Sequence, residues 1–297
     1  MEKKYLFLLL LLGVLQGAAF LFIKIAVSFL NPFNVVFLRI ILALPCIYLF
    51  VFYRYSDIFS VVKAHFPILL LLSLSSVIIP FLLIAWAGQY IASGVASIYM
   101  ALIPIFVSIF EVIFRKNIGF SLRAYLGLFL GFIGVILLFI NDLLSNFSHG
   151  LWGHVACFVA AICYAFSIYK SKALSVLAPA LIGCGVLSLA SLLLLPMLSL
   201  MPLPKLIWTA PWWSILGLAF ISTAGALILM YYLIDQIGTV FTATTNYLVP
   251  LVGIFLGFIF LHERLSNMLV PAVSLILVGL YCVSTGKKQH RDLLDDT

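Results

Sequence analysis

Two apolar stretches indicate the fold: LVPLVGIFLGFIFLHERLS at residues 248–266 and LIPIFVSIFEVIFRKNIG at residues 102–119. Each has a proline near its start and ends in a short cluster of ionisable residues. A helix that crosses a bilayer needs about 20 mostly apolar residues. Each stretch is therefore expected to span a membrane and to stop at a water interface.

The whole chain has the composition of these two stretches. Of its 297 residues, 65% are hydrophobic and 8% are charged, and the mean hydropathy is +1.29. A soluble protein needs more polar side chains to cover its surface, and the alternation typical of a membrane β-barrel is missing. The expected fold class is all-α integral membrane. The net charge is +7, but the basic residues that produce it lie in short clusters between apolar runs, so no nucleic-acid partner is expected.

Polar and proline-rich breaks divide the chain into ten predicted spans. The apolar character of the first continues to Leu30, too far for a cleaved signal peptide, so it is expected to be an uncleaved helix. The predicted spans are 5–29, 33–53, 67–88, 91–114, 121–140, 150–172, 176–200, 212–234, 238–261 and 267–285.

Lys and Arg near the span ends predict the orientation, because cytoplasmic loops are enriched in them. With the N-terminus inside, 12 of the 16 Lys and Arg residues fall on the cytoplasmic side, whereas Lys205 and Arg264 fall outside and Lys24 and Arg39 fall within spans. An even number of spans then returns the C-terminus to the cytoplasm. The expectation is a multi-pass protein of the cytoplasmic (inner or plasma) membrane with both termini inside.

A shift of 146 residues relates the two halves. It places Pro104 on Pro250 and Lys24 on Lys170. The same shift places Ser76 on Ser222. This predicts two five-span repeats, 1–145 and 146–286, followed by a cytoplasmic tail, 287–297. Because five is odd, the second repeat is expected to be inverted, an architecture of secondary transporters.

Three stretches, KIAVSFLNPFNVVFLR (24–39), AWAGQYIASGVASIYMALIPIF (85–106) and QIGTVFTATTNYLVPLVGIFLGFIFLHERLS (236–266), resemble the EamA-type carriers of the drug/metabolite transporter superfamily. The resemblance covers essentially the whole chain. It implies ten helices, a central cavity lined by helices 1–4 and 6–9, and peripheral helices 5 and 10. One position departs from the family pattern. The family often has a glutamate at the end of the fourth span, whereas this chain has Asn117 there, at the position that the repeat aligns with Glu263.

Charged residues inside or beside spans need a reason, because burying a charge in the bilayer is costly. Lys24 and Arg39 each lie seven residues from the turn at Asn31 and Pro32, or about 10 Å along a helix. We predict an outer gate in which one of them pairs with Glu263. The alternative is that these side chains extend to lipid headgroups.

A second gate is predicted on the inner side, where Glu111 can pair with Lys170. The alternative is local pairing of Glu111 with Arg115, four residues along the same helix. Pro104 and Pro250 are predicted to kink their spans; hinges and static bends are both open.

Amide and aromatic side chains deep in the spans are expected to line a small-molecule cavity, with packing as the alternative for each aromatic ring. The candidate substrate-binding residues are Gln16, Phe20, Trp86, Tyr99, Tyr164, Tyr232 and Asn246.

These features predict a secondary transporter that moves a small metabolite, such as an amino acid or related organic compound, or a drug, by alternating access, with export as the expected direction. The alternatives are a membrane-embedded enzyme and a non-transporting scaffold. Neither catalytic residues nor a metal or cofactor are expected. The expected partners are a small-molecule substrate and the lipid bilayer; monomer and homodimer both stay open. Unpaired Lys24 and Arg39 would favour a carboxylate, whereas pairing with Glu263 would favour a neutral or cationic amphiphile.

Overall fold

The computed structural model describes residues 3–52, 58–91, 93–115, 121–146, 150–199, 211–261 and 268–286. Within these ranges the secondary structure is helical and contains no strand. Eight segments are long and apolar enough to cross a membrane, as expected for a membrane protein, and two apolar helices are shorter (Leu122–Gly134 and Val270–Val283). The eight are Lys3–Ala26, Pro32–Leu49, Phe66–Ala87, Ser93–Phe114, Leu151–Leu174, Pro179–Leu198, Trp213–Ile237 and Thr239–Phe260. The layout of ten spans in two repeats stays a prediction.

Several spans are built from more than one helical element. The first half contains α1 (Lys3–Ala26), α2 (Pro32–Phe52), α3 (Ile58–Ala64), α4 (Phe66–Leu72), η1 (Ser73–Ile78), α5 (Ile79–Ala87), α6 (Ser93–Ile98), η2 (Tyr99–Leu102), α7 (Ile103–Arg115) and α8 (Leu122–Asn146). The second half contains α9 (Leu151–Ser171), η3 (Lys172–Leu174), α10 (Pro179–Leu194), η4 (Leu195–Ser199), α11 (Trp213–Leu216), η5 (Gly217–Gly225), α12 (Ala226–Ile237), α13 (Thr239–Ala243), η6 (Thr244–Tyr247), α14 (Val249–Leu261) and α15 (Leu269–Gly286).

Two of these elements, η1 and η5, are π-helical. A π-helical turn is wider than an α-helical one and frequently occurs at functional sites. Hydroxyl groups bond to backbone carbonyls here: Ser76 donates to Leu72 O at 2.7 Å, and Thr223 donates to Leu218 O at 2.6 Å. Polar side chains are thereby accommodated in the middle of otherwise apolar spans.

The two prolines predicted as hinges have a common setting. Pro104 and Pro250 each follow a 3₁₀ segment and lie in the first turn of an α-helix, α7 and α14 respectively. Proline is tolerated in a first turn because its missing N–H has no intrahelical partner there. The structure therefore accounts for both prolines as helix starts, and their hinge role stays a prediction.

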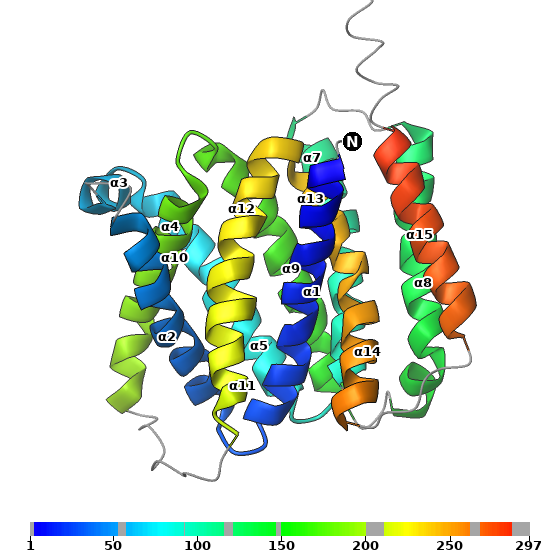
Figure 1. Ribbon diagram of the computed structural model, residues 1–297, viewed down its shortest axis with the longest axis horizontal. Coiled ribbons are helices and arrows are strands. Elements are labelled where there is room, and N and C mark those ends of the chain that lie inside the picture. Colours follow the sequence, from blue (N-terminus) through cyan, green and yellow to red (C-terminus); the bar gives the residue numbers. More distant parts are fainter. Residues whose placement is uncertain are drawn as a thin grey trace, which may run out of the picture.

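The helices lie roughly alongside one another, and α1 crosses the centre of the view in Figure 1. We call the end where α1 begins the upper end, and the end where α1 turns into α2 the lower end (Figure 1). The last turn of α15 also lies at the upper end. Helix α1 packs against α12, η5, α14 and α6, so it contacts elements of both halves of the chain.

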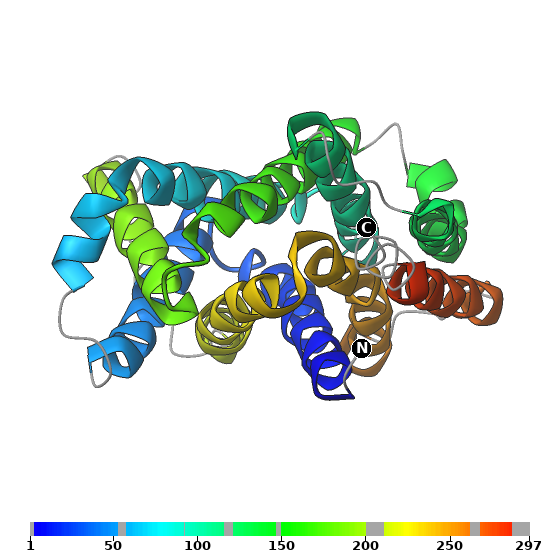
Figure 2. The same ribbon diagram turned by 90° about the horizontal axis from the view of Figure 1, so that it is seen from above.

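Helices α8 and α15 form a pair at one edge of the molecule (Figures 1 and 2). Their backbones approach closely through glycines: a Cβ on Gly127 would lie 2.6 Å from the carbonyl oxygen of Gly279, and a Cβ on Gly279 would lie 2.6 Å from that of Gly127. Small residues permit such contacts between membrane helices. The close contact between α8 and α15 thus holds the pair together at the edge of the molecule, away from α1 (Figures 1 and 2).

Candidate functional site

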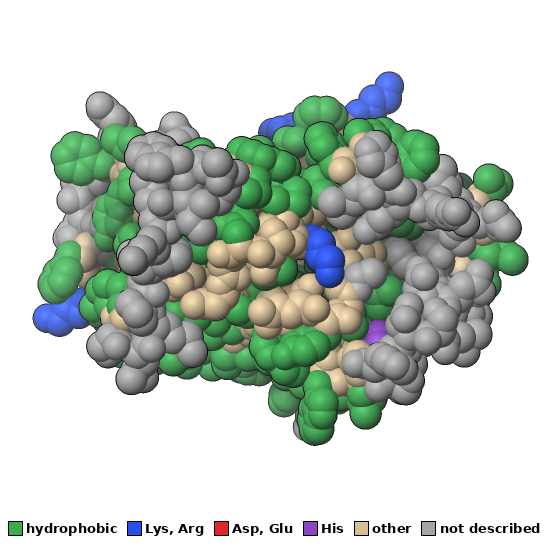
Figure 3. Space-filling view, turned by 90° about the horizontal axis from the view of Figure 1, so that it is seen from below, with side chains coloured by type: hydrophobic (Ala, Val, Ile, Leu, Met, Phe, Trp, Pro, Cys, Tyr) green, Lys and Arg blue, Asp and Glu red, His purple; other side chains and the backbone are tan. Residues whose placement is uncertain are grey.

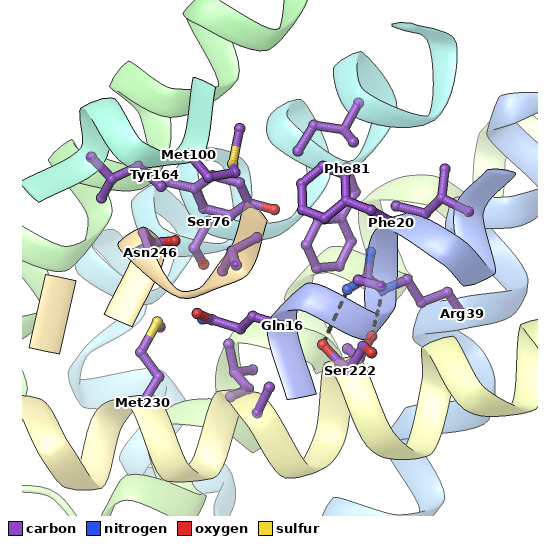
Figure 4. Close-up of a pocket in the computed structure, with 18 of the residues that line it drawn as sticks. Gln16, Phe20, Arg39, Ser76, Phe81, Met100, Tyr164, Ser222, Met230 and Asn246 are labelled. Carbon is purple, nitrogen blue, oxygen red and sulfur yellow. Dashed lines mark hydrogen bonds between the residues drawn. The ribbon is translucent and has the colours of Figure 1, made fainter. Parts of the chain in front are cut away.

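A cavity of about 90 Å³ lies beside α1 in the middle of the bundle, and both halves of the chain line it. Most of its wall is apolar, as in small-molecule sites generally. The residues that give it polar or aromatic character are Gln16, Phe20, Arg39, Ser76, Phe81, Tyr164, Ser222, Thr223 and Asn246 (Figure 4).

Arg39 is the charged residue of this wall. It comes from α2, is 5% exposed and donates from Nε to the hydroxyl of Thr223 and from Nη2 to the carbonyl of Ser222 at 3.2 Å. Both acceptors belong to η5. The guanidinium carbon lies 3.6 Å from the ring centroid of Phe81, a favourable cation–π position.

No aspartate or glutamate is among the described residues that line the cavity. The two hydrogen bonds of Arg39 go to neutral oxygens, so its positive charge has no carboxylate counterpart among the described residues. A buried cation is strongly disfavoured unless it is paired or hydrogen-bonded. Arg39 thus gives the cavity a positive end.

Hydrogen-bonding groups lie on the other side of the cavity. In Figure 4 the polar ends of Gln16, Ser76 and Asn246 lie across the cavity from Arg39 and Ser222, and the Tyr164 hydroxyl points into the space between. Asn246 donates from Nδ2 to the carbonyl of Ala243 at 3.0 Å. The Oε1 atom of Gln16 is buried without a hydrogen-bond partner among the described residues. A buried acceptor of this kind is available to a ligand that donates a hydrogen bond.

A second, smaller pocket adjoins the cavity toward the lower end, and Phe20, Ile23 and Ile84 line both. Lys24 lies in this second pocket and donates from Nζ to the carbonyls of Gly88 at 3.0 Å and Ile91 at 3.3 Å. These carbonyls belong to the turn that follows α5. Lys24 therefore ties α1 to that turn. The lower face shows a basic side chain among backbone and other non-hydrophobic atoms, with hydrophobic side chains around this area (Figure 3).

Different contacts hold the helices together at the upper end. The Thr239 hydroxyl, at the start of α13, donates to Oε1 of Glu111 in α7. Lys4 donates to the Tyr232 hydroxyl at 3.3 Å, which joins α1 to α12. These bonds connect the first half of the chain to the second.

Neither predicted gate pair is seen among the described residues. Glu263 lies outside the described residues, and the other member of the outer pair, Lys24 or Arg39, binds the neutral groups given above. Lys170 lies over the rings of Phe166 and Tyr169, at 5.7 and 5.5 Å from their centroids, and forms no ion pair with Glu111. A gating role for these five residues stays a prediction.

The predicted substrate-binding residues divide into two groups. Gln16, Phe20, Tyr164 and Asn246 come together in the cavity wall. The other three lie outside the cavity lining: Trp86 is 36% exposed and packs on Tyr90, Tyr99 is hydrogen-bonded to His154 Nδ1 at 3.0 Å, and Tyr232 is bonded to Lys4.

Sequence reasoning did not assign several cavity residues to the site. The repeat aligns Ser76 with Ser222, and this recurrence of a hydroxyl at one position could have identified both as site residues. Both side chains are buried in the structure. Thr223 follows Ser222 directly. Phe81 and Met230 carried no signal, since single aromatic and methionine residues are common in any span. Arg39 was assigned to a gate rather than to the cavity wall.

Fold and site together define a multi-helix membrane protein with an internal cavity between helices. A family model described as the EamA-like transporter family matches the chain twice, at residues 3–140 and 151–285. The chain is 25% identical to an uncharacterized transporter of Archaeoglobus fulgidus over 98% of this chain and 100% of that protein. It is 22% identical to the uncharacterized transporter YoaV of Bacillus subtilis over 90% of this chain and 92% of YoaV.

Two further comparisons agree. The uncharacterized inner membrane transporter YedA of Escherichia coli K12 is 25% identical over 67% of this chain and 64% of YedA. A crystal structure with 13% sequence identity superposes with a TM-score of 0.77, covering 97% of this chain and 99% of that chain, which shows a shared fold. The chain belongs to the EamA-like transporter family and is a multi-pass membrane transporter.

Proposed function

We propose that the protein is a secondary carrier that moves a small metabolite or drug across the cytoplasmic membrane by alternating access, with export as its direction. The observation that carries this proposal is the cavity beside α1, which is lined by both halves of the chain and by groups able to bind a polar ligand. In carriers built from inverted repeats, the site lies near the membrane midplane between the repeats. The similarity to an inner membrane transporter supports the location.

The internal repeat of the proposed carrier comprises residues 1–145 and 146–286, with 287–297 as a cytoplasmic tail. Three observations support it. The family model matches each half separately. A shift of 146 residues carries η1 into η5, both of them π-helical, and carries η2 onto most of η6, both of them 3₁₀ segments. π-Helical turns are rare, so the recurrence of one at the same offset favours a duplicated unit over two unrelated halves.

Alternating access requires contacts that close each end in turn. The bonds of Lys24 at the lower end and the bond between Thr239 and Glu111 at the upper end are suited to this role. In the proposed orientation both termini are cytoplasmic, because Lys and Arg are concentrated near the ends of the spans on that side. The upper end then faces the cytoplasm and the lower end faces outward.

Cysteine accessibility tests the proposal without knowledge of the substrate. All five cysteines are replaced by alanine, and Ser76→Cys is introduced, because Ser76 lines the cavity and cysteine has nearly the same size. Sealed vesicles of each orientation are treated with a membrane-impermeant maleimide. We expect Ser76→Cys to react from both sides. Ser28→Cys, exposed at the lower end, and Gln236→Cys, exposed at the upper end, serve as one-sided controls.

Modification of Ser76→Cys from one side only, or from neither, would contradict the carrier and favour a receptor or scaffold. Modification from both sides is also expected of an open channel. In a carrier, a change that raises the modification rate of Ser76→Cys from one side lowers the rate from the other side, whereas in a channel the two rates are independent. Variants at Lys24 and Thr239 separate these cases (Discussion).

A further inference from the structure

Arg39 has hydrogen-bonding capacity that the protein does not use. A guanidinium group has five N–H donors arranged in a rigid plane. The two bonds of Arg39 are made by Nε and Nη2, which lie on one edge of that plane. The fork between Nη1 and Nη2 is therefore unused by the described residues. This fork matches the two oxygens of a carboxylate, which it binds in a bidentate manner.

The position of the group suits ligand binding rather than packing alone. Arg39 is buried at 5% exposure and lines the cavity, and the face of its guanidinium is covered by Phe81. The bonds to Thr223 and Ser222 fix the Nε edge. Little side-chain entropy is then lost when a ligand binds, because a fixed group is already ordered.

The charge of the cavity limits the charge of the ligand. Among the described residues, Arg39 is the cation of the cavity lining; Lys24 lies in the adjoining pocket, where its Nζ binds two carbonyls. One buried cation compensates one negative charge. A phosphate monoester, which carries about two charges at neutral pH, would leave one charge uncompensated in an apolar surrounding, and that is costly.

The remainder of the wall describes the body of the ligand. Phe20, Ile84, Leu227 and Val249 supply apolar surface around the space. The volume of about 90 Å³ is smaller than that of an engineered cavity of about 150 Å³ that binds benzene. The apolar body of the ligand is therefore expected to be smaller than a benzene ring.

We propose that the cavity binds a small monocarboxylate with an aliphatic body, whose carboxylate oxygens accept hydrogen bonds from the Nη1–Nη2 fork of Arg39. The identification of this ligand as the transported substrate rests on the carrier function proposed above. The binding itself can be tested apart from transport.

The test compares each carboxylate with its neutral amide, which has nearly the same shape. The probes are 3-methylbutanoate with 3-methylbutanamide, and propanoate with propanamide. The unfolding temperature of the full-length protein is measured in detergent at pH 7 as a function of probe concentration. A ligand that binds only the folded state raises the unfolding temperature. We expect at least one of the carboxylates to do so, and its amide to have at least about tenfold lower affinity, or 1.4 kcal/mol.

Variants assign the effect to Arg39. Arg39→Gln is expected to bind carboxylate and amide equally, and Arg39→Lys to retain part of the preference because it keeps the charge and loses the fork. Arg123→Gln is the control, since Arg123 is a basic residue of α8 that lies over the Tyr281 ring and lines neither pocket, and it is expected to keep the full preference. The comparison of carboxylate and amide on the unaltered protein stands even if a variant does not fold.

Equal stabilisation by carboxylates and amides, stabilisation by neither carboxylate, or an unchanged preference in folded Arg39→Gln would overturn the proposal. These outcomes are separable from failure of the carrier function. Two-sided modification of Ser76→Cys without carboxylate binding overturns the ligand and is consistent with a carrier for another class of substrate. Carboxylate binding with one-sided modification leaves a binding site in a protein that does not transport.

Discussion

The guanidinium carbon of Arg39 lies 3.6 Å from the ring centroid of Phe81, so a cation from α2 is stacked on an aromatic ring from α5 inside the bundle. Few positions in a membrane protein can hold a charge away from water, because the cost of burial must be offset by local contacts. Here the ring face and two oxygens of η5 provide those contacts. This relationship links the stability of the helices to the ligand chemistry of the cavity.

The contact between Arg39 and Phe81 should appear as coupling in a double-mutant cycle. We compare unfolding free energies of Arg39→Gln, Phe81→Leu and the double variant. A desolvated cation–π contact is worth about 2 kcal/mol, so a coupling energy of about 1–2 kcal/mol is expected. Phe37→Leu, a buried ring that stacks on Phe33 instead, is the control and should be additive with Arg39→Gln. Additivity of the Arg39 and Phe81 changes would show that the stacking contributes no stability.

Gln16→Met should make the empty protein more stable. The substitution keeps the length of the side chain and removes the buried Oε1 acceptor that has no partner among the described residues. An unsatisfied buried acceptor costs about 1–3 kcal/mol, so unfolding in detergent should occur at a higher temperature. Gln236→Met is the control, because its Oε1 accepts from Tyr5 at the exposed upper end; no gain is expected. A lower unfolding temperature of Gln16→Met would mean that Oε1 does form a stabilising bond.

Gly127→Ala should separate α8 from α15. Its new methyl group would lie 2.6 Å from the Gly279 carbonyl oxygen and 2.8 Å from the backbone nitrogen of Val283, and neither backbone atom can move aside easily. Overpacking of this kind costs about 1–3 kcal/mol. Gly183→Ala is the control, because its nearest atom, in the Leu227 side chain, is 3.6 Å away. Equal unfolding free energies for the two variants would mean that the α8–α15 contact adjusts without cost.

Much of the fold could be read from the sequence, because span length and apolar composition are properties of consecutive residues. The eight long segments are each centred near a predicted span. The site was predicted in part for a related reason. Gln16 and Asn246 were recognised by their depth in a span, and both line the cavity. Trp86 has comparable depth but lies outside the lining, since depth does not reveal the direction of a side chain around the helix axis.

The partners of Arg39 could not be predicted. They lie on η5, where the π-helical turns change the angular position of every following side chain relative to a regular α-helix. A periodicity of 3.6 residues therefore does not give the directions of the Ser222 and Thr223 side chains. Glu263 was predicted as a partner from its charge and its place at the outer end of a span; it lies outside the described residues, so that pairing stays a prediction. Among the described residues, Arg39 contacts a hydroxyl, a carbonyl and an aromatic ring.

Thr239→Val should weaken the upper end. The change removes the hydroxyl that donates to Glu111 and keeps the shape of the side chain. A hydrogen bond to a charged group contributes about 1.5–3 kcal/mol. In a carrier the loss favours the state open at the upper end, so Ser76→Cys should react faster from that side and more slowly from the lower side. Thr242→Val, whose hydroxyl bonds only within its own segment to the Gly238 carbonyl, is the control and should leave both rates unchanged.

Lys24→Met provides the opposite change and the sharpest test of alternating access. It removes the bonds from Nζ to the carbonyls of Gly88 and Ile91 that tie α1 to the turn after α5; Ser28→Ala, at the same end of α1, is the control. The measurement is the rate at which an impermeant maleimide modifies Ser76→Cys from each side of sealed vesicles. A loss of about 1–2 kcal/mol corresponds to a population shift of about 5–30-fold. We predict that the rate from the lower side rises and the rate from the upper side falls. A rise from the lower side with an unchanged rate from the upper side would contradict alternating access and indicate a channel, and unchanged rates from both sides would exclude Lys24 as a closing contact.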